Sequence, residues 1–254
     1  MRKPPKKRWF QYSLRTLLVL LVACAVVLGW RVNRARKNRE RVAPVRKAVV
    51  EIQRLGGRVY NEAPSYFDGN YYLDEGSIQE RWSATWLETL LDDPGDGSRD
   101  WKVRIVKLDG TDVTDAEMEH LIALTTLVEL NLNDSHVTDA GLEHLKGLEK
   151  LRALELGNTD VTDAGLQHLK ELKELVVLEL YGTKVTDAGL EQIKEMKLEL
   201  LFLSLSGTIV TDAGLGHLRG LANLRELWLQ DTKVTAEGVK KLQQALPNCK
   251  VRNP

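Results

Sequence analysis

From residue 101 onward, the sequence repeats itself every 24 or 25 residues. Each copy follows the pattern T-x-V-T-D-A-x-L-x-x-L-x-x-L-x-x-L-x-x-L-x-L-x-G, with small departures. One unit of this size cannot bury its own leucines, so neighbouring units must stack into a solenoid. The copies, aligned on a Thr or Ser, begin at Thr111, Ser135, Thr159, Thr183, Thr208 and Thr232.

The end of each unit alternates apolar and polar side chains, which predicts a short strand with one buried face. The first strand belongs to a degenerate copy of the repeat and should bury Val106 and Leu108. The expected inward pairs of the later strands are Leu130 and Leu132, Leu154 and Leu156, Leu178 and Leu180, Leu203 and Leu205, and Leu227 and Leu229. Residue types that tolerate a left-handed backbone close these strands and predict a repeated turn at Gly110, Asp134, Asn158, Gly182, Gly207 and Asp231.

A helix is predicted after each turn, because a threonine stands at the N-cap position and an aspartate follows it at the positive helix end. Glu117 completes a capping box with Thr114 in the first unit. The extra residue of the fourth unit falls near 197–199, between helix and strand, and a helix over 236–245 followed by LPNCKV should close the far end. The remaining caps and their aspartates are Thr138 and Asp139, Thr162 and Asp163, Thr186 and Asp187, and Thr211 and Asp212.

The repeat unit resembles a leucine-rich repeat of the T-D-x-G-L type, which also occurs in F-box-associated proteins. The whole chain resembles bacterial membrane-anchored leucine-rich-repeat proteins, through the F-x-x-S-L-R-T segment at Phe10–Thr16 and the A-V-x-x-I-x-x-L-G-G segment at Ala48–Gly57. This resemblance implies an α/β solenoid, with a parallel sheet on the concave side and helices on the convex side. It implies a protein-interaction scaffold and brings no catalytic residue and no cofactor. Residues 1–100 contain no F-box, which argues against a ubiquitin-ligase adaptor.

An uncharged segment over residues 16–30 predicts a transmembrane signal-anchor helix. Its 15 residues are fewer than the ~20 that usually span a bilayer, but aromatic flanks extend it and Arg15 can reach the headgroups. Two alternatives remain open: a cleaved signal peptide, and lipidation of Cys24 within the box Leu21–Cys24. The flanking aromatic residues are Trp9, Phe10, Tyr12 and Trp30.

Charge is segregated along the chain, although 36 basic residues balance 36 acidic residues overall. Residues 1–47 contain 14 Lys and Arg against Glu40 alone, so the remainder is acidic by the same excess. The basic stretch beside an apolar helix predicts contact with membrane lipids through residues 9–47, and without interleaved aromatics no nucleic-acid partner is expected. Basic residues flank the apolar segment on both sides, so orientation is weakly specified. We expect the repeats to be exported from a single-pass anchor in the cell membrane.

The predicted organisation is a basic tail over 1–15, the anchor over 16–30, a juxtamembrane linker over 31–47, a cap over 48–100 and the repeats over 101–254, with five full units at 111–231. In the cap, Val45, Val49, Ile52 and Leu55 share one helical face, Gly56 and Gly57 end that helix, and residues 58–60 predict a strand. A tyrosine-rich stretch at Tyr66–Tyr72, a helix over Ser83–Leu91 and an acidic turn at 92–100 complete it.

Catalytic chemistry is not expected, since no nucleophile elbow, phosphate-binding loop or H-E-x-x-H motif occurs. The two cysteines cannot form a disulfide framework or a multi-cysteine metal site. Recurrent histidines and aspartates are explained by the repeat itself, so no metal site is predicted. The histidines are His120, His144, His168 and His217.

Side chains that alternate with the buried leucines point to the concave side and form the candidate binding surface. Glutamates at its centre predict a small acidic patch, which suits a basic protein partner. Phe202 and Trp228 are expected to be exposed aromatic anchors near the C-terminal end. The alternatives are a structural envelope protein that self-associates and, less favoured, an enzyme with a pocket in the tyrosine-rich cap. The candidate residues are Glu129, Asn131, Glu155, Glu179, Tyr181, Phe202, Ser204, Trp228 and Gln230.

Overall fold

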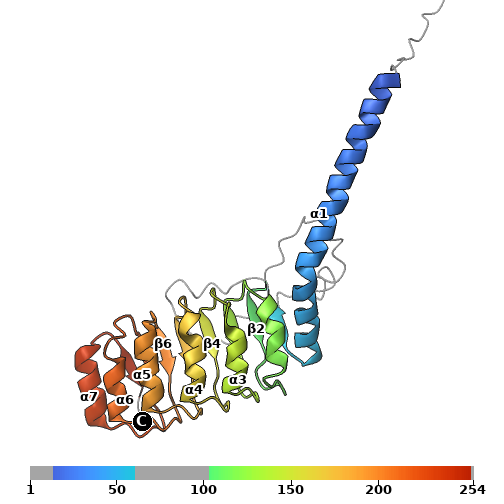
Figure 1. Ribbon diagram of the computed structural model, residues 1–254. Coiled ribbons are helices and arrows are strands. Elements are labelled where there is room, and N and C mark those ends of the chain that lie inside the picture. The colour runs from blue at the N-terminus through green and yellow to red at the C-terminus, as the bar shows by residue number, and fades with distance from the viewer. Residues whose placement is uncertain (1–13, 61–102, 253–254) are drawn as a thin grey trace, which may run out of the picture.

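The computed structural model describes residues 14–60 and 103–252. An N-terminal helix projects from one end of a row of stacked units, and each unit pairs one strand with one helical segment (Figure 1). The expected features of residues 1–13 and of the cap over 61–102, among them Tyr66–Tyr72, the helix Ser83–Leu91 and the acidic turn, lie outside the described residues.

Helix α1 runs without interruption over Leu14–Arg54, a length of 41 residues that includes Pro44. One helix thus covers the segments that the sequence predicts as anchor, linker and start of the cap. Pro44 has no N–H to donate, so the backbone carbonyl four residues earlier lacks its helical hydrogen bond. Pro44 lies on an exposed part of the helix, where no packing contact depends on it. None of the helices in the described part of the chain combines the length and the apolarity that a bilayer crossing requires.

The C-terminal turns of α1 pack against the first repeat, as the helical face predicted. Ala48, Val49 and Ile52 are buried in the same core as the leucines of the repeats. Gly56 then takes a positive φ of 82°, and strand β1 (Arg58–Tyr60) pairs antiparallel with β2. The helix therefore closes the N-terminal end of the solenoid.

One eight-stranded sheet runs through the molecule in chain order, β1 to β8. All pairs from β2 onward are parallel, and each three-residue strand pairs in register with the next. This confirms the α/β solenoid with parallel strands. The strands after β1 are β2 (Ile105–Lys107), β3 (Glu129–Asn131), β4 (Ala153–Glu155), β5 (Val177–Glu179), β6 (Phe202–Ser204), β7 (Glu226–Trp228) and β8 (Lys250–Arg252).

Helical segments cover the opposite side of the sheet (Figure 1). Several are a single turn long. Near the extra residue of the fourth unit, α5 ends at Met196, and Lys197 follows as its C-cap in a left-handed conformation with a φ of 53°. The segments are η2 (Glu117–Ala123), α3 (Asp139–Leu142), η3 (Glu143–Leu145), α4 (Asp163–Leu166), η4 (Gln167–Glu171), α5 (Asp187–Met196), α6 (Asp212–Leu218) and α7 (Ala236–Ala245).

The core lies between the sheet and the helical segments. The predicted inward leucines of β3 to β7 are each 0% exposed, which confirms the assignment of the strand faces. All six predicted turn positions have a positive φ, between 53° at Asn158 and 70° at Gly207. These turns let the chain leave the sheet sharply enough to begin the next helix.

Successive units are joined by a ladder of aspartate and threonine. One carboxylate oxygen of Asp163 accepts from the backbone N–H of Thr186 at 2.8 Å, and the other accepts from its hydroxyl at 2.6 Å. The Thr186 hydroxyl in turn accepts from the N–H of Ala188 and caps α5. The same bonds join Asp115 to Thr138, Asp139 to Thr162, Asp187 to Thr211 and Asp212 to Thr235.

The glycine of the D-A-G-L motif makes room for this ladder. A Cβ on Gly189 would collide with the Asp163 carboxylate of the preceding unit, and the glycines at 141, 165, 214 and 238 face their preceding aspartates in the same way. The motif therefore encodes a contact between units as well as a helix start. The sequence predicted the caps but placed the aspartates only against their own helices.

Candidate functional site

The concave side of the sheet presents two parallel rows of side chains, because the first and third residues of each strand face away from the core. The strand register defines both rows. Row one consists of Ile105, Glu129, Ala153, Val177, Phe202, Glu226 and Lys250. Row three consists of Lys107, Asn131, Glu155, Glu179, Ser204, Trp228 and Arg252.

The centre of row three is acidic. Glu155 and Glu179 are direct neighbours across β4 and β5, where parallel strands lie ~4.8 Å apart. Burial raises the pKa of Glu155 to about 8, and the charges of Glu179 and Glu129 add to this shift. Burial also raises the pKa of Glu179. The two carboxyl groups are therefore held close together where a positive charge would stabilise their ionised forms.

Two asparagines orient the acidic centre. The Asn133 amide donates to Glu155 Oε2 at 3.1 Å, while its carbonyl oxygen accepts from the backbone N–H of Gly157 at 2.6 Å. The side chain of Asn131 accepts from the backbone N–H of Asn133 at 2.9 Å. Glu129 is paired differently, because Lys107 Nζ lies 3.6 Å from its Oε1. Lys107 thus offsets one of the three glutamates.

Ser204 continues row three beyond Glu179, its register neighbour. The residue is 1% exposed, and its hydroxyl has no hydrogen-bond partner within residues 14–60 and 103–252. A buried hydroxyl without a partner is costly, so this position has unused hydrogen-bonding capacity beside a carboxylate.

The C-terminal end of the concave face is aromatic. Phe202 and Trp228 pack edge to face, with ring centroids 5.1 Å apart and an interplanar angle of 75°. The guanidinium of Arg252 lies 5.0 Å from the Trp228 ring centroid, and the indole Nε1 donates to Glu226 Oε2 at 3.3 Å. Trp228 is half-buried between these partners.

The expected exposure of Phe202 is wrong, since the residue is only 3% exposed. It belongs to a small apolar cluster with Ala153 and Val177 of row one, against which Val176 and Trp228 pack. The phenyl ring therefore supports Trp228 from the concave side of the sheet. Strand alternation predicted the correct face of the sheet for Phe202, but not that its neighbours would bury the ring.

Tyr181 and Gln230 lie just beyond the strands, in a third line of concave positions. A Cβ on Gly157 would collide with the Tyr181 ring, so this glycine allows the ring to lie over the backbone of the previous unit. Burial raises the pKa of Tyr181 to about 12, and Asp134 adds to the shift. Ser206 donates to Gln230 Oε1 at 2.8 Å.

All nine predicted site residues lie on the concave side of the sheet. Sequence reasoning missed Lys107 and Arg252, the cations at the two ends of row three. The sequence could have shown them, because the repeat register extends into the degenerate segments WKVRIVK and CKVRN. This register places both residues in row three.

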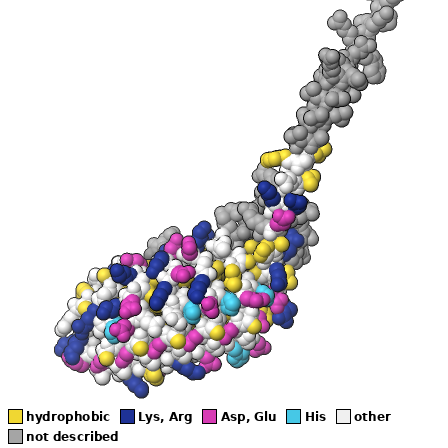
Figure 2. Space-filling view, in the orientation of Figure 1, with side chains coloured by type: hydrophobic (Ala, Val, Ile, Leu, Met, Phe, Trp, Pro, Cys, Tyr) yellow, Lys and Arg dark blue, Asp and Glu magenta, His cyan; other side chains and the backbone are white. Residues whose placement is uncertain are grey.

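The four recurrent histidines lie on the helical side, where they are half-buried. Figure 2 shows this side with basic and acidic side chains interspersed and histidines between them. Within the described residues, no group of three or more His, Cys, Asp or Glu side chains is arranged to hold a metal ion.

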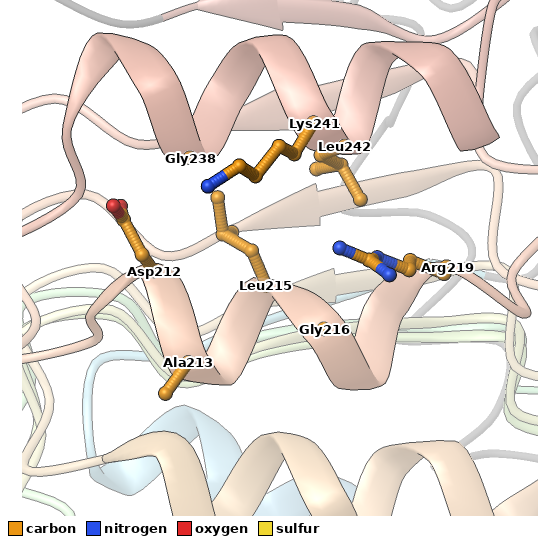
Figure 3. A pocket seen from close by; sticks show the side chains of 8 residues that line it. All are labelled: Asp212, Ala213, Leu215, Gly216, Arg219, Gly238, Lys241 and Leu242. Carbon is orange, nitrogen blue, oxygen red and sulfur yellow. The ribbon is translucent and has the colours of Figure 1, made fainter.

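A small groove of about 180 Å³ lies between α6 and α7 on the helical side (Figure 3). It opens at Gly216, which stands where other units have Glu143, Gln167 or Glu191. Asp212 and Lys241 border it, but Asp212 already binds Thr235, and Glu237 lies 3.7 Å from Lys241. The groove follows from the missing side chain at Gly216, and Arg219 also lines it.

The geometry defines a solenoid of stacked strand–helix units with one sheet that is parallel from β2 onward. Residues 123–146 and 147–170 match the family model described as Leucine Rich repeat, in agreement with the repeat units seen here. No curated protein matches this chain.

Solved structures of bacterial leucine-rich-repeat proteins are similar to it. Internalin C2 of Listeria monocytogenes is 21% identical, with a TM-score of 0.41, over 60% of this chain and 81% of that one. A leucine-rich-repeat protein of Leptospira interrogans is 19% identical, with a TM-score of 0.39, over 52% of this chain and 38% of that one. The Listeria internalin inlF is 20% identical, with a TM-score of 0.37, over 58% of this chain and 52% of that one.

Proposed function

We propose that this protein is a membrane-tethered interaction module that binds a protein partner through the concave face of its repeats. The observation that carries the proposal is the composition of row three. It places the neighbouring carboxyl groups of Glu155 and Glu179 three and two strands away from the half-buried Trp228. Tryptophan is a frequent interface anchor, and paired carboxylates favour a basic partner.

Site-specific photo-crosslinking tests the proposal in the cells that make the protein. A benzophenone amino acid replaces Tyr181 or Trp228 on the concave side, and Glu191 on α5 serves as the matched helical-side position. We expect both concave positions to crosslink to one discrete protein, identified by mass spectrometry, and the control to give none. Crosslinks only from Glu191 would overturn the proposal. Crosslinks only to further copies of the same chain would overturn it in favour of the self-associating envelope protein.

The membrane part of the proposal rests on the uncharged segment 16–30 and the basic residues around it. We propose that residues 9–47 contact membrane lipids and that the repeats lie outside the cell membrane. Carbonate extraction should leave the full chain in the membrane pellet, and its release would contradict a tether.

Protease treatment of intact cells should degrade the repeats, whereas protection until lysis would reverse the orientation. Mass spectrometry of the N-terminal peptide separates an intact anchor from cleavage or lipidation at Cys24.

A further inference from the structure

We propose that Glu155, Glu179 and Ser204 form a binding site for one lysine or arginine side chain of the protein partner. This inference rests on the proposed function and identifies the chemistry of its central contact. The three residues occupy consecutive positions of row three on β4, β5 and β6, so their side chains are presented side by side on the concave face.

The first argument is that two neighbouring carboxyl groups have no ion-pair partner among the described residues. Within the described residues, Lys107 forms its ion pair with Glu129 and makes only a minor contribution that lowers the pKa of Glu155. Glu155 receives a neutral hydrogen bond from Asn133, which orients the carboxylate without cancelling its charge. Burial raises the pKa of both groups, and the charges of neighbouring glutamates add to the shift, so a nearby cation would favour the ionised forms. A cation placed between them would gain two charge-assisted hydrogen bonds and relieve the repulsion.

The second argument is independent of charge and concerns Ser204. Its hydroxyl is buried, lies beside Glu179 in the register and has no partner within the described residues. A hydroxyl oxygen can accept a third hydrogen bond from an ammonium or guanidinium group that the two carboxylates hold. Ammonium carries three donors, which matches the three acceptors of this row.

The surroundings favour a side chain of a protein over a free small cation. Trp228 follows Ser204 in the same row, where it can cover the alkyl part of a long basic side chain. Row one offers Ala153, Val177 and Phe202 along the same strands, which gives the site an apolar border. A lysine or arginine combines such an alkyl stem with a cationic head.

Peptide titration of the purified full chain tests the inference. The probes are a blocked (Lys-Ser)₃ peptide, its uncharged (Gln-Ser)₃ counterpart and the single residue N-acetyl-lysine amide. We expect Glu155→Gln and Glu179→Gln each to weaken the lysine peptide about tenfold or more, as loss of a charge-assisted bond predicts. Ser204→Ala should weaken it severalfold. Glu191→Gln, which removes the same charge from the exposed side of α5, should leave the affinity within about twofold.

Equal effects of all three glutamine variants would overturn the inference, because they would show only long-range attraction. Equal binding of the two peptides would overturn it as well. If N-acetyl-lysine amide binds as tightly as the peptide, the site takes small cations and not a protein segment. A dimer in sedimentation that Glu179→Gln abolishes would assign the site to a basic segment of a second copy. Circular dichroism and melting of each variant confirm that the fold is kept.

Failure of this inference differs from failure of the proposed function. If the glutamine variants keep the photo-crosslink from Tyr181, the concave face still binds its partner, and the cation site is wrong. If no concave position forms a crosslink in the chain without the glutamine substitutions, the proposed function itself fails.

Discussion

Single glycines in this chain have opposite roles that the structure distinguishes. Gly189→Ala would place a methyl group against the Asp163 carboxylate, which is held by two hydrogen bonds. Gly216 lies in α6, and a Cβ there meets no atom within 4 Å. We expect Gly189→Ala to lower the free energy of unfolding by about 2–3 kcal/mol, through loss of those bonds.

Gly216→Ala is the matched control and should raise stability by about 0.5–1 kcal/mol, because alanine restricts the unfolded chain and favours the helix. Urea denaturation of the two variants measures both effects. Equal stability of the variants would show that the ladder does not require a glycine.

Glu155 makes stability depend on pH in an unusual direction. Its pKa is raised from 4.5 to about 8 by burial, so between these values the folded protein binds a proton that the unfolded chain has lost. Stability from this group is therefore present at low pH and is lost as pH rises towards 8. Glu155→Gln should flatten part of this loss and be more stable than the parent at pH 9, by on the order of 2 kcal/mol.

Melting temperatures of the parent and of Glu155→Gln between pH 5 and 9 check this sign. The glutamine keeps an oxygen to accept from Asn133, so the hydrogen bond remains available. Parallel curves for the two proteins would contradict a raised pKa at Glu155.

At the scale of elements, the aspartate ladder couples each helix to the next unit. Asp163→Ala leaves the N–H and hydroxyl of Thr186 without their shared acceptor and should cost about 2–4 kcal/mol. Asp160 provides the contrast, since it binds Lys184 at 2.7 Å between exposed side chains. Asp160→Ala should cost much less than Asp163→Ala, because solvent screens an ion pair between exposed side chains. Thermal unfolding of both variants tests the ordering, and the reverse order would assign the coupling to surface charge.

Most elements could be predicted from the sequence because the same short-range rules recur in each unit. Leucine alternation specified the strand faces, and the left-handed turns followed from Gly, Asn and Asp at one position. The burial of Phe202 and the continuation of α1 through Pro44 could not be predicted, since both depend on tertiary context. The ladder was missed for a similar reason: helix-cap rules describe one helix, and the aspartate bonds join two units.

At the scale of the whole molecule, the ladder ends within the chain. Ala236 stands where other units have the aspartate, so the last unit offers no carboxylate to a successor. At the other end, the N–H of Thr114 donates to Glu117 of its own unit at 2.9 Å, and α1 packs on the first helical segment. Both terminal threonine positions are thus satisfied internally. Within the described residues, the ladder therefore runs from Asp115 to Thr235.

The repeat also predicts that one unit can be removed without loss of the fold. Deleting residues 159–182, which span 24 positions, joins Asn158 to Thr183 at equivalent points of the pattern. Asp139 then faces Thr186, and β4 meets β6, each with the partner type it already has. Because a solenoid is stabilised by contacts between nearest neighbours, the shortened chain should keep a cooperative transition at a lower melting temperature.

A deletion of residues 159–170 is the control, since 12 residues remove the helical return that a parallel strand connection requires. Circular dichroism should show a folded solenoid for the full-unit deletion and loss of the cooperative transition for the half-unit deletion. Equal unfolding of both would mean that the units are not equivalent.

The full-unit deletion also removes Glu179, so it should weaken binding of the lysine peptide about tenfold while the solenoid stays folded. This result would separate the proposed cation site from the fold that supports it.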